Sequence, residues 1–280
     1  MIRELTHHDI EQVYSILRKE FNDIDTKYLS NTFDTSYKFI VWDDEGINGF
    51  ANITLIDKSE RNWNLQIYVD PQFRNRGIGT ALYQHIEQIL FNQKASIITT
   101  NFRVDIYNPS YFFNKLGYNK WYGSPELHYR GTIQPDVDID IVPYEDKYYQ
   151  QYAICRQESF YELSVKNDFR PYKIPLSDED RKYLFDKKDT IFITLSEEHL
   201  VGAITIDNGY LDHIMVSPAY QGKGYGKKLT QFGINKAISS GAHLVYICYI
   251  EGNEKAERLY PSLGFEVVCN THVYRKFMNN

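Results

Sequence analysis

Two short loops in the sequence combine glycines with a long polar side chain, as a phosphate-binding turn requires. The first loop reads RNRGIG from Arg74 to Gly79, and the second reads QGKGYG from Gln221 to Gly226. Each follows a hydrophobic run ending in Val-x-Pro and leads into a helical pattern. At such a turn the backbone N–H groups and the helix dipole favour an anion, and glycines let a phosphate come close. The sequence therefore predicts two anion cradles.

Either loop alone could instead be a tight strand-to-helix turn, but the repetition of its whole context favours the cradles.

Two other nucleotide-binding motifs do not fit. A P-loop needs GKS or GKT after its second glycine, and neither loop has it. A Rossmann loop follows an early strand, whereas each of these loops comes late in its half of the chain.

The loops belong to a repeat that organises the chain. NKLGY (Asn114–Tyr118) matches PSLGF (Pro261–Phe265) at the same offset as the loops, and INGFAN resembles LVGAIT. Glycine, proline and polar residues interrupt the pattern at RGTIQPDVD, residues 130–138. We therefore expect two domains, residues 1–134 and 135–280, which suits a length of 280 residues.

Each half has the same order of predicted elements, and this order positions the loops. A short strand and helices come first, with helical patterns at residues 8–21 and 145–163, and a hairpin follows at 38–56 and 190–206. Next come the strand that feeds the loop and a helix, whose apolar stripe in the first half is Leu82, Ile86 and Ile89 or Leu90. An apolar strand, a short helix and a final hairpin complete each half. This mixture predicts an α/β or α+β fold with a sheet in each domain.

Composition narrows the classes of function. The formal net charge is -6 and no basic tract is long, so we expect neither nucleic acid nor membrane as a partner. Cys155, Cys248 and Cys269 have no metal-ligand spacing and cannot form a disulfide framework, so we expect a reducing cytoplasm and no metal. The start MIRELTHHD has no apolar signal core, and no apolar run approaches membrane-spanning length.

With these motifs in place, the chain resembles two GNAT domains in tandem, the acetyl-CoA-dependent N-acetyltransferases. The pyrophosphate motif of that family, Arg/Gln-x-x-Gly-x-Gly/Ala, stands here in both glycine loops. A second family motif, from an Asn through Ala to Leu-Tyr and Gly-Phe, is matched by NEKAERLYPSLGF (Asn253–Phe265). The resemblance covers nearly the whole chain as motif order and element order.

The resemblance implies that each domain is a twisted, mostly antiparallel sheet whose two central strands splay apart around the pantetheine arm of acetyl-CoA. Loop amides would bind the pyrophosphate, the strand before the second loop would hold the pantetheine, and Asn253 would contact the pantetheine or a water. Asn253 could also be a helix N-cap, and both roles are compatible. The residues that the resemblance implies for cofactor binding are Arg74, Asn75, Arg76, Gly77, Ile78, Gly79, Ile214, Met215, Val216, Gln221, Gly222, Lys223, Gly224, Tyr225, Gly226 and Asn253.

Tyr260 stands where the family places a tyrosine that donates a proton to the departing thiolate. Its alternative role is a buried aromatic with a hydrogen-bonded hydroxyl. The matching residue of the first domain is Phe113, which cannot donate, so we expect catalysis in the second domain and a degenerate first domain. The first domain would either bind acetyl-CoA or only buttress the second.

Asp212 is the candidate base, because strand alternation puts it on one face with Ile214 and Val216. Burial would raise the pKa of this carboxylate towards a range that suits base work. The alternative is a solvated carboxylate at a strand end. The linear offset makes Leu65 its counterpart in the first domain, and alternation assigns His213 to the opposite face as a structural histidine.

The acceptor is expected to be a primary amine, with a small cationic amine favoured. Glu158, Tyr161 and Glu162 lie in the helical segment that forms one wall of the acceptor cleft in this family, and they would suit a cation. The alternative for these three residues is an ordinary solvated helix face. A different class of function also stays open, namely a non-catalytic acyl-CoA-binding sensor or a subunit that presents a partner.

Overall fold

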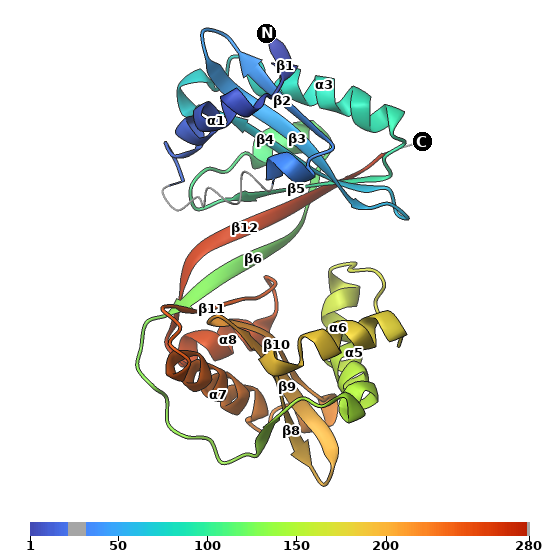
Figure 1. The fold of residues 1–280 in the computed structure, drawn as a ribbon, viewed down its shortest axis with the longest axis vertical. Helices are drawn as coiled ribbons and strands as arrows, with labels where there is room; N and C mark the ends of the chain where they lie inside the picture. The colour runs from blue at the N-terminus through green and yellow to red at the C-terminus, as the bar shows by residue number, and fades with distance from the viewer. Residues whose placement is uncertain (22–31, 279–280) are drawn as a thin grey trace. The chain divides into compact units, whose positions relative to one another are not determined.

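The computed structural model describes residues 1–21 and 32–278, and the chain divides into two compact units. One unit consists of Met1–Trp121 together with Thr271–Asn280, and the other of Tyr122–Asn270. Each unit is a mixed, mostly antiparallel sheet with helices on both faces (Figure 1). The expected α+β class is therefore confirmed.

In the first unit the strands are hydrogen-bonded in the order β1-β2-β3-β4-β5-β12. Their bounds are β1 Ile2–Glu4, β2 Lys38–Asp43, β3 Ile47–Asp57, β4 Asn62–Val69, β5 Ile97–Arg103 and β12 Phe265–Phe277. The central pair, β4 and β5, is parallel, and the pairs on both sides are antiparallel. Helix α1 (Ile10–Leu17) packs with Phe39 and Val41, whereas α3 (Ile78–Asn92) packs with Ile40, so alternation along β2 places these helices on opposite faces.

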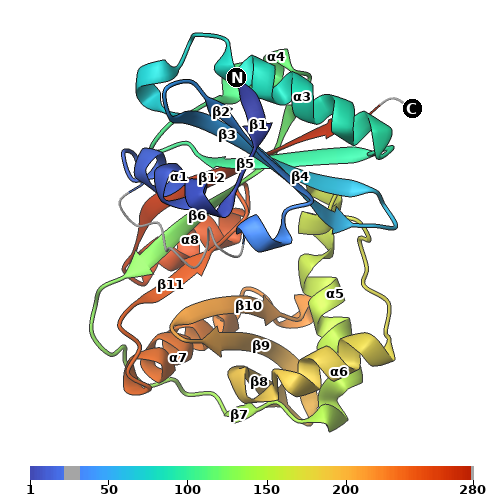
Figure 2. The ribbon, with the colours of Figure 1, turned by 45° about the horizontal axis from the view of Figure 1, so that its top comes forward.

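The second unit repeats this plan with the order β7-β8-β9-β10-β11-β6. Its strands are β7 Ile141–Pro143, β8 Ile191–Ser196, β9 His199–Asp207, β10 Tyr210–Val216, β11 Val245–Cys248 and β6 Asn119–Tyr129, and β10 and β11 form the parallel pair. Figures 1 and 2 show α5 (Tyr149–Lys166) and α7 (Tyr225–Ser239) flanking β9 and β10. Ala203 packs under α5 and Ile204 under α7, as alternation along β9 requires.

Shorter helices complete the two units. They are α4 Ser110–Lys115, α6 Asp178–Asp186 and α8 Glu254–Ser262, with 3₁₀ turns at His7–Asp9, Pro71–Phe73, Asp146–Tyr148, Lys188–Thr190 and Pro218–Tyr220. The stripe expected on α3 is confirmed, with Leu82, Ile86 and Leu90 fully buried. Within the described residues, no helix combines the length and the apolar composition needed to cross a bilayer.

The last strand of each half differs from the expected hairpin. A single long strand follows α4 and another follows α8, and these two strands exchange units. Residues 126–129 of β6 pair with β11 of the second unit, and residues 271–277 of β12 pair with β5 of the first. Because the exchanged strands pair with the sheet of the other half, the observed division falls at residues 121/122 and 270/271 instead of at 134/135.

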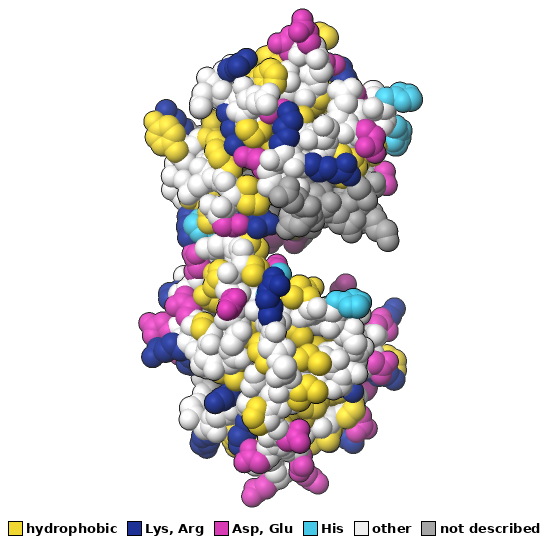
Figure 3. All heavy atoms as spheres, turned by 90° about the vertical axis from the view of Figure 1, so that its left-hand side faces the viewer, with side chains coloured by type: hydrophobic (Ala, Val, Ile, Leu, Met, Phe, Trp, Pro, Cys, Tyr) yellow, Lys and Arg dark blue, Asp and Glu magenta, His cyan; other side chains and the backbone are white. Residues whose placement is uncertain are grey.

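Charged side chains are mixed on the surface that Figure 3 shows. Lys and Arg side chains are interspersed with Asp and Glu side chains over that face, and the formal net charge of the chain is -6. Such a face does not generate the single-sign field that draws nucleic acid to a protein.

The two parallel strand pairs separate soon after they form. The ladder between β4 and β5 runs from Asn62 to Asn64, and the ladder between β10 and β11 includes only Tyr210 and Leu211. Beyond these residues β4 and β10 are paired on their other edge alone, with β3 and β9. Each unit therefore has an opening between its two central strands, next to the glycine loop.

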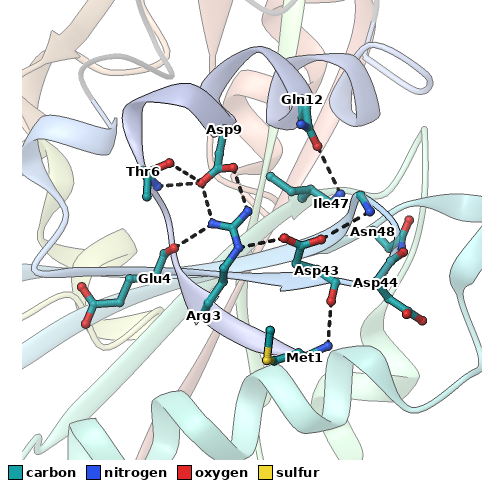
Figure 4. A network of polar contacts seen from close by, with 11 residues as sticks. Met1, Arg3, Glu4, Thr6, Asp9, Gln12, Asp43, Asp44, Ile47 and Asn48 are labelled. Atoms are coloured by element: carbon teal, nitrogen blue, oxygen red, sulfur yellow. Dashed lines mark hydrogen bonds and ion pairs between the residues drawn. The ribbon is translucent and has the colours of Figure 1, made fainter.

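A partly buried ion pair holds the N-terminal strand of the first unit to its first helix (Figure 4). The Nη1 and Nη2 groups of Arg3 donate to the two carboxylate oxygens of Asp9 at 2.7 and 2.8 Å, and its Nε donates to Asp43 at 2.8 Å. Asp9 also accepts from the backbone N–H and the hydroxyl of Thr6. The hydrogen bonds from Arg3 outweigh burial and hold the pKa of Asp9 well below its usual range.

We expect Arg3→Leu to destabilise the first unit by about 3 kcal/mol at pH 7, because it leaves the buried Asp9 carboxylate without its partner. The pKa of Asp9 is depressed in the folded state, so its contribution is present above the pKa of the unfolded chain, about 4, and is lost as the pH falls. Urea unfolding should therefore show a penalty that shrinks below about pH 4. Asp9→Asn added to Arg3→Leu is the control and should recover part of the loss, whereas a penalty independent of pH would contradict the assignment.

Candidate functional site

The glycine loop of the second unit presents uncapped backbone amides at the start of α7. Gly224 is the N-cap residue of α7, with a φ of 87°, and no side chain caps the helix. Gly222 also has a positive φ, 76°, and a Cβ on either glycine would meet no atom within 4 Å. The loop therefore leaves open space in front of uncapped N–H groups, which is the geometry that a bound phosphate would need.

The loop of the first unit has the same geometry. Gly77 is the N-cap residue of α3 with a φ of 84°, again without a side-chain cap, and Asn75 also has a positive φ, 61°. A Cβ on Gly77 would meet no atom within 4 Å. The same glycine N-cap geometry is thus built twice in one chain.

The long side chain that opens each loop bonds to the strand before it. Gln221 donates from Nε2 to the carbonyl of Val216 at 2.9 Å, and Arg74 donates from Nε to the carbonyl of Val69 at 3.0 Å. Both carbonyls are the last of their strands. Gln221 and Arg74 therefore hold the loops in shape, which is a structural role beside the cofactor contact expected from the sequence.

A cavity of about 530 Å³ opens in the second unit where β10 and β11 separate. It brings together four residues that the sequence singled out, namely Asp212, Ile214, Asn253 and Tyr260. One face of α5 and the segment 169–174 form the remaining walls. Met215 and Val216 lie outside this lining, because Met215 is buried under α5 and Val216 packs on the α7 side.

Tyr260 has the properties of a proton donor. Its side chain is 7% exposed and packs against Tyr249 and Phe265. Burial, and then the negative charge of Asp212, raises the pKa of the Tyr260 hydroxyl above its usual value. The hydroxyl is therefore protonated at neutral pH, and among the described residues it has no hydrogen-bond partner, so it is available to a ligand.

Asn253 acts as the N-cap residue of α8. Its Oδ1 accepts a hydrogen bond from the backbone N–H of Ala256 at 3.3 Å. The side chain also lines the cavity. The capping role inferred from the sequence is confirmed, and the position at the cavity leaves the role in ligand binding open beside it.

A β-bulge changes the faces of β10. Asp212 pairs with Thr205 and Met215 pairs with Ala203, so two residues, His213 and Ile214, oppose Ile204. Asp212 and Met215 therefore share a face, and Val216 lies on the other. The expected alignment of Asp212 with Val216 was wrong, because the extra residue reverses the alternation. Asp212 nevertheless reaches the cavity, together with Ile214.

His213 also lines the cavity, so its assignment to a face away from the site was wrong. Its Nδ1 lies 2.9 Å from one carboxylate oxygen of Asp212, and its backbone N–H donates to the other at 2.7 Å. Burial raises the pKa of Asp212, but the hydrogen bonds and charge of His213 lower it further, and the net pKa is below the usual range. The raised pKa expected for Asp212 was therefore wrong.

The three residues expected to bind the acceptor lie on the opposite face of α5. Glu158, Tyr161 and Glu162 are exposed and do not line the cavity. Tyr152, Ala153 and Cys155 bury one side of α5 against β9, and this fixes the rotation of the helix. The side chains of α5 that do line the cavity are Arg156, Gln157, Phe160, Leu163 and Ser164.

The first unit has a cavity of about 630 Å³ at the corresponding place. The cradle contributes Arg74, Asn75, Gly77, Ile78 and Gly79 to its lining, together with aromatic side chains such as Phe102 and Phe112. Arg76 is not part of this lining, and its guanidinium lies over the ring of Phe73. Phe113 is stacked on Phe102 with ring centroids 5.5 Å apart.

The register of the strands changes the expected counterpart of Asp212. Gly49 pairs with Val69 in the first unit as Gly202 pairs with Val216 in the second. Three residues after the glycine, Thr205 of β9 pairs with Asp212, and Asn52 of β3 pairs with Gln66. Gln66 is therefore the structural counterpart of Asp212. The expected counterpart Leu65 corresponds instead to Leu211, because β4 has no bulge in this stretch. Gln66 lines the first cavity but, as a neutral amide, cannot act as a base.

Sequence reasoning missed His213, Cys248 and the wall formed by residues 169–174. The neighbouring Asp212 was the only signal for His213, and nothing in the pattern of the strand indicated the bulge. Among the described residues, no group of three His, Cys, Asp or Glu side chains is placed to hold a metal ion.

Comparison with solved structures shows the same fold. The chain is similar to a GCN5-related N-acetyltransferase from Sphaerobacter thermophilus (TM-score 0.75, 16% identity, covering 100% of this chain and 96% of that one). It is also similar to a tandem GNAT protein from the clavulanic acid biosynthesis pathway (TM-score 0.66, 14% identity, covering 100% and 99%). At sequence identities of 16% and 14%, these two matches show a shared fold and do not carry over an activity or a substrate.

Sequence comparison adds the family. A ribosomal protein bS18 alanine N-acetyltransferase from Haemophilus ducreyi is 33% identical over 63 residues, which make up 22% of this chain and 43% of that protein. The match thus spans less than half of that relative's length. A model of the acetyltransferase (GNAT) family matches residues 7–118 and 157–265, and each segment contains one glycine cradle. The chain therefore belongs to the GNAT family of acetyltransferases.

Proposed function

We propose that the second unit transfers an acetyl group from acetyl-CoA to a primary amine. The observation that carries this proposal is the hydroxyl of Tyr260, which is protonated, has no partner among the described residues and lies in one cavity with Asp212. Transfer ends with a thiolate leaving group, which a neighbouring O–H stabilises by giving it a proton. A protein that only bound acyl-CoA would have no use for such a donor.

The amine attacks the thioester directly, with both substrates bound. An acyl-enzyme route through cysteine would need a thiolate, and Cys248 is the cysteine that lines the cavity. Burial, and then the nearby charge of Glu126, raises the pKa of Cys248 to about 12. This thiol is therefore protonated at neutral pH and is a poor nucleophile.

The acceptor is an amine with an apolar body. Aromatic side chains from α5, the segment after it and β10 line the cavity, for example Phe160, Phe169 and Tyr210. Arg156 is matched by Asp180, whose carboxylate oxygens it contacts at 2.8 and 2.9 Å. Because the charge of Arg156 is neutralised by Asp180, the carboxylate of Asp212 is left to attract the ammonium group of the acceptor. A small cationic amine therefore remains favoured. Glu158 and Glu162 lie outside the cavity and take no part in this binding.

The first unit binds acetyl-CoA without turning it over. Its cavity includes the cradle, which supports binding. Phe113 stands in place of the donor tyrosine, and Gln66 stands where the second unit has Asp212, so the first unit lacks both the hydroxyl and the carboxylate.

The experiment that tests this function measures the release of free CoA thiol from acetyl-CoA with a panel of arylalkyl, alkyl and polar amines. Release that depends on the amine, with acetylated amine found by mass spectrometry, would support the enzyme. Binding of acetyl-CoA without release on any amine would instead support a non-catalytic acyl-CoA-binding protein.

We expect Gly224→Asp to weaken binding of acetyl-CoA to the second unit at least tenfold, because it places a negative charge at the cradle. Gly224→Asn is the matched control, since Asn has the same shape and both residues tolerate a positive φ. Calorimetry would compare the two variants. Equal affinities would show that the pyrophosphate does not lie there.

We expect Tyr260→Phe to lower kcat about 10- to 1,000-fold, with little change in affinity for acetyl-CoA, because it removes the proton donor and keeps the ring. The matched change in the other unit is Phe113→Leu, which should leave kcat unaltered and lower only the thermal stability of the first unit. Full activity of Tyr260→Phe would mean that the thiolate takes its proton from elsewhere.

We expect Cys248→Ala to keep kcat within about threefold of the wild type, because a thiol with a pKa of about 12 does not form an acyl-enzyme. Quenched-flow mass spectrometry with acetyl-CoA alone should detect no acetylated protein. A loss of turnover together with an acetylated intermediate in the wild type would contradict direct attack.

A further inference from the structure

We propose that His213, positioned by Asp212, is the base that removes the proton from the acceptor amine. This inference rests on the proposed function, and it replaces the direct role as base that the sequence suggested for Asp212. It is carried by the bulge in β10, by the contacts between the two side chains and by their place in the cavity.

His213 belongs to the insertion that sets the second unit apart from the first. The ladder of β4 is regular from Trp63 to Val69, whereas β10 has one additional residue between Asp212 and Met215. His213 has a φ of 46°, in the left-handed region that a non-glycine residue rarely adopts. A bulge beside an active site often turns a side chain to where the chemistry needs it. Here it turns an imidazole into the cavity that holds Tyr260.

Asp212 fixes the imidazole by two contacts. One carboxylate oxygen lies 2.9 Å from Nδ1, and the other accepts the backbone N–H of His213 at 2.7 Å. An ionised carboxylate beside Nδ1 holds the proton of the neutral ring there and leaves the lone pair on Nε2. Phe160 on α5 meets the ring edge-to-face, with centroids 6.3 Å apart, and limits its rotation.

Asp212 itself is a poor base, because both of its oxygens contact His213 and its pKa is lowered. Besides tyrosines, the charged or titratable groups of the described residues that line the cavity with His213 are Arg156, Arg170, Asp212 and Cys248. Arg156 is paired with Asp180, Arg170 is paired with Asp168, and the Cys248 thiol is protonated. None of these three groups can accept a proton from the amine at neutral pH.

The protons of the reaction balance with this assignment. An acceptor that arrives as an ammonium ion loses two protons in total, and the thiolate gains one. The first proton passes to Nε2 of His213 and then to solvent, which the imidazole reaches because its side chain is 45% exposed. The second proton leaves the nitrogen as the C–N bond forms and the C–S bond breaks. Tyr260 gives its own proton to the departing sulfur, and the second proton from the nitrogen restores the Tyr260 hydroxyl.

The test compares His213→Asn with the wild type, because Asn tolerates the left-handed conformation and does not titrate near neutrality. In the wild type, kcat/KM should rise with pH through an ascending limb, because a general base must lose its own proton before it can act. His213→Asn should lower kcat/KM about 100-fold at pH 7 and lose this limb. Its activity should approach that of the wild type above about pH 10, where alkyl amines are largely free bases.

Asp212→Asn tests the positioning role, since it keeps the imidazole and removes the charge that orients it. It should lower kcat/KM about tenfold and keep an ascending limb. Tyr260→Phe is the control that should lower kcat without removing the limb. A wild type that releases no CoA thiol with any amine would refute the proposed function. An active wild type whose rate and pH profile survive in His213→Asn would overturn the assignment of His213 alone.

Discussion

The separation of the two parallel central strands is the constraint on which the rest of the site depends. A strand that leaves its partner exposes backbone groups that must find other partners. At the end of β10 the carbonyl of Val216 accepts from Gln221 and from the hydroxyl of Ser159, both at 2.9 Å. At the end of β4 the carbonyl of Val69 accepts from Arg74. The first residue of the family motif thus gives the last carbonyl of the separated strand a hydrogen-bond donor. The same hydrogen bond positions the glycines that follow this residue.

The two units share one scaffold and differ at a few positions around their cavities. Both units keep the separated strands, the glycine N-cap and a cavity of several hundred Å³. The second unit adds a bulge residue to the central strand and a hydroxyl to the short helix, whereas the first has a regular strand and Phe113. One inserted residue changes the face of every residue on one side of it, and in the second unit both Asp212 and His213 line the cavity beside this insertion.

Local patterns could be read from the sequence, and pairings between distant segments could not. The cradles, the stripe of α3 and the two hairpins each depend on residues close together in the chain. The exchange of β6 and β12 depends on strands that meet across more than a hundred residues, and no local signal specifies the partner. The faces of Asp212 and His213 were misjudged because strict alternation is a rule for regular strands. The face of α5 that lines the cavity could not be read from the charge pattern, because the charged side of an amphipathic helix need not face a cavity.

The rotation of α5 also decides which of its side chains line the cavity. Tyr152 and Cys155 pack into the core beneath β9, and this turns Phe160 and Leu163 towards the cavity and Glu158 towards solvent. Arg156 is buried on the same helix and pairs with Asp180 of α6, so it holds the segment between the two helices against the site. That segment contributes Phe169, Tyr172 and Ile174 to the wall. Much of the cavity wall is therefore built by a stretch of chain that lies outside the glycine loop and the splayed strands.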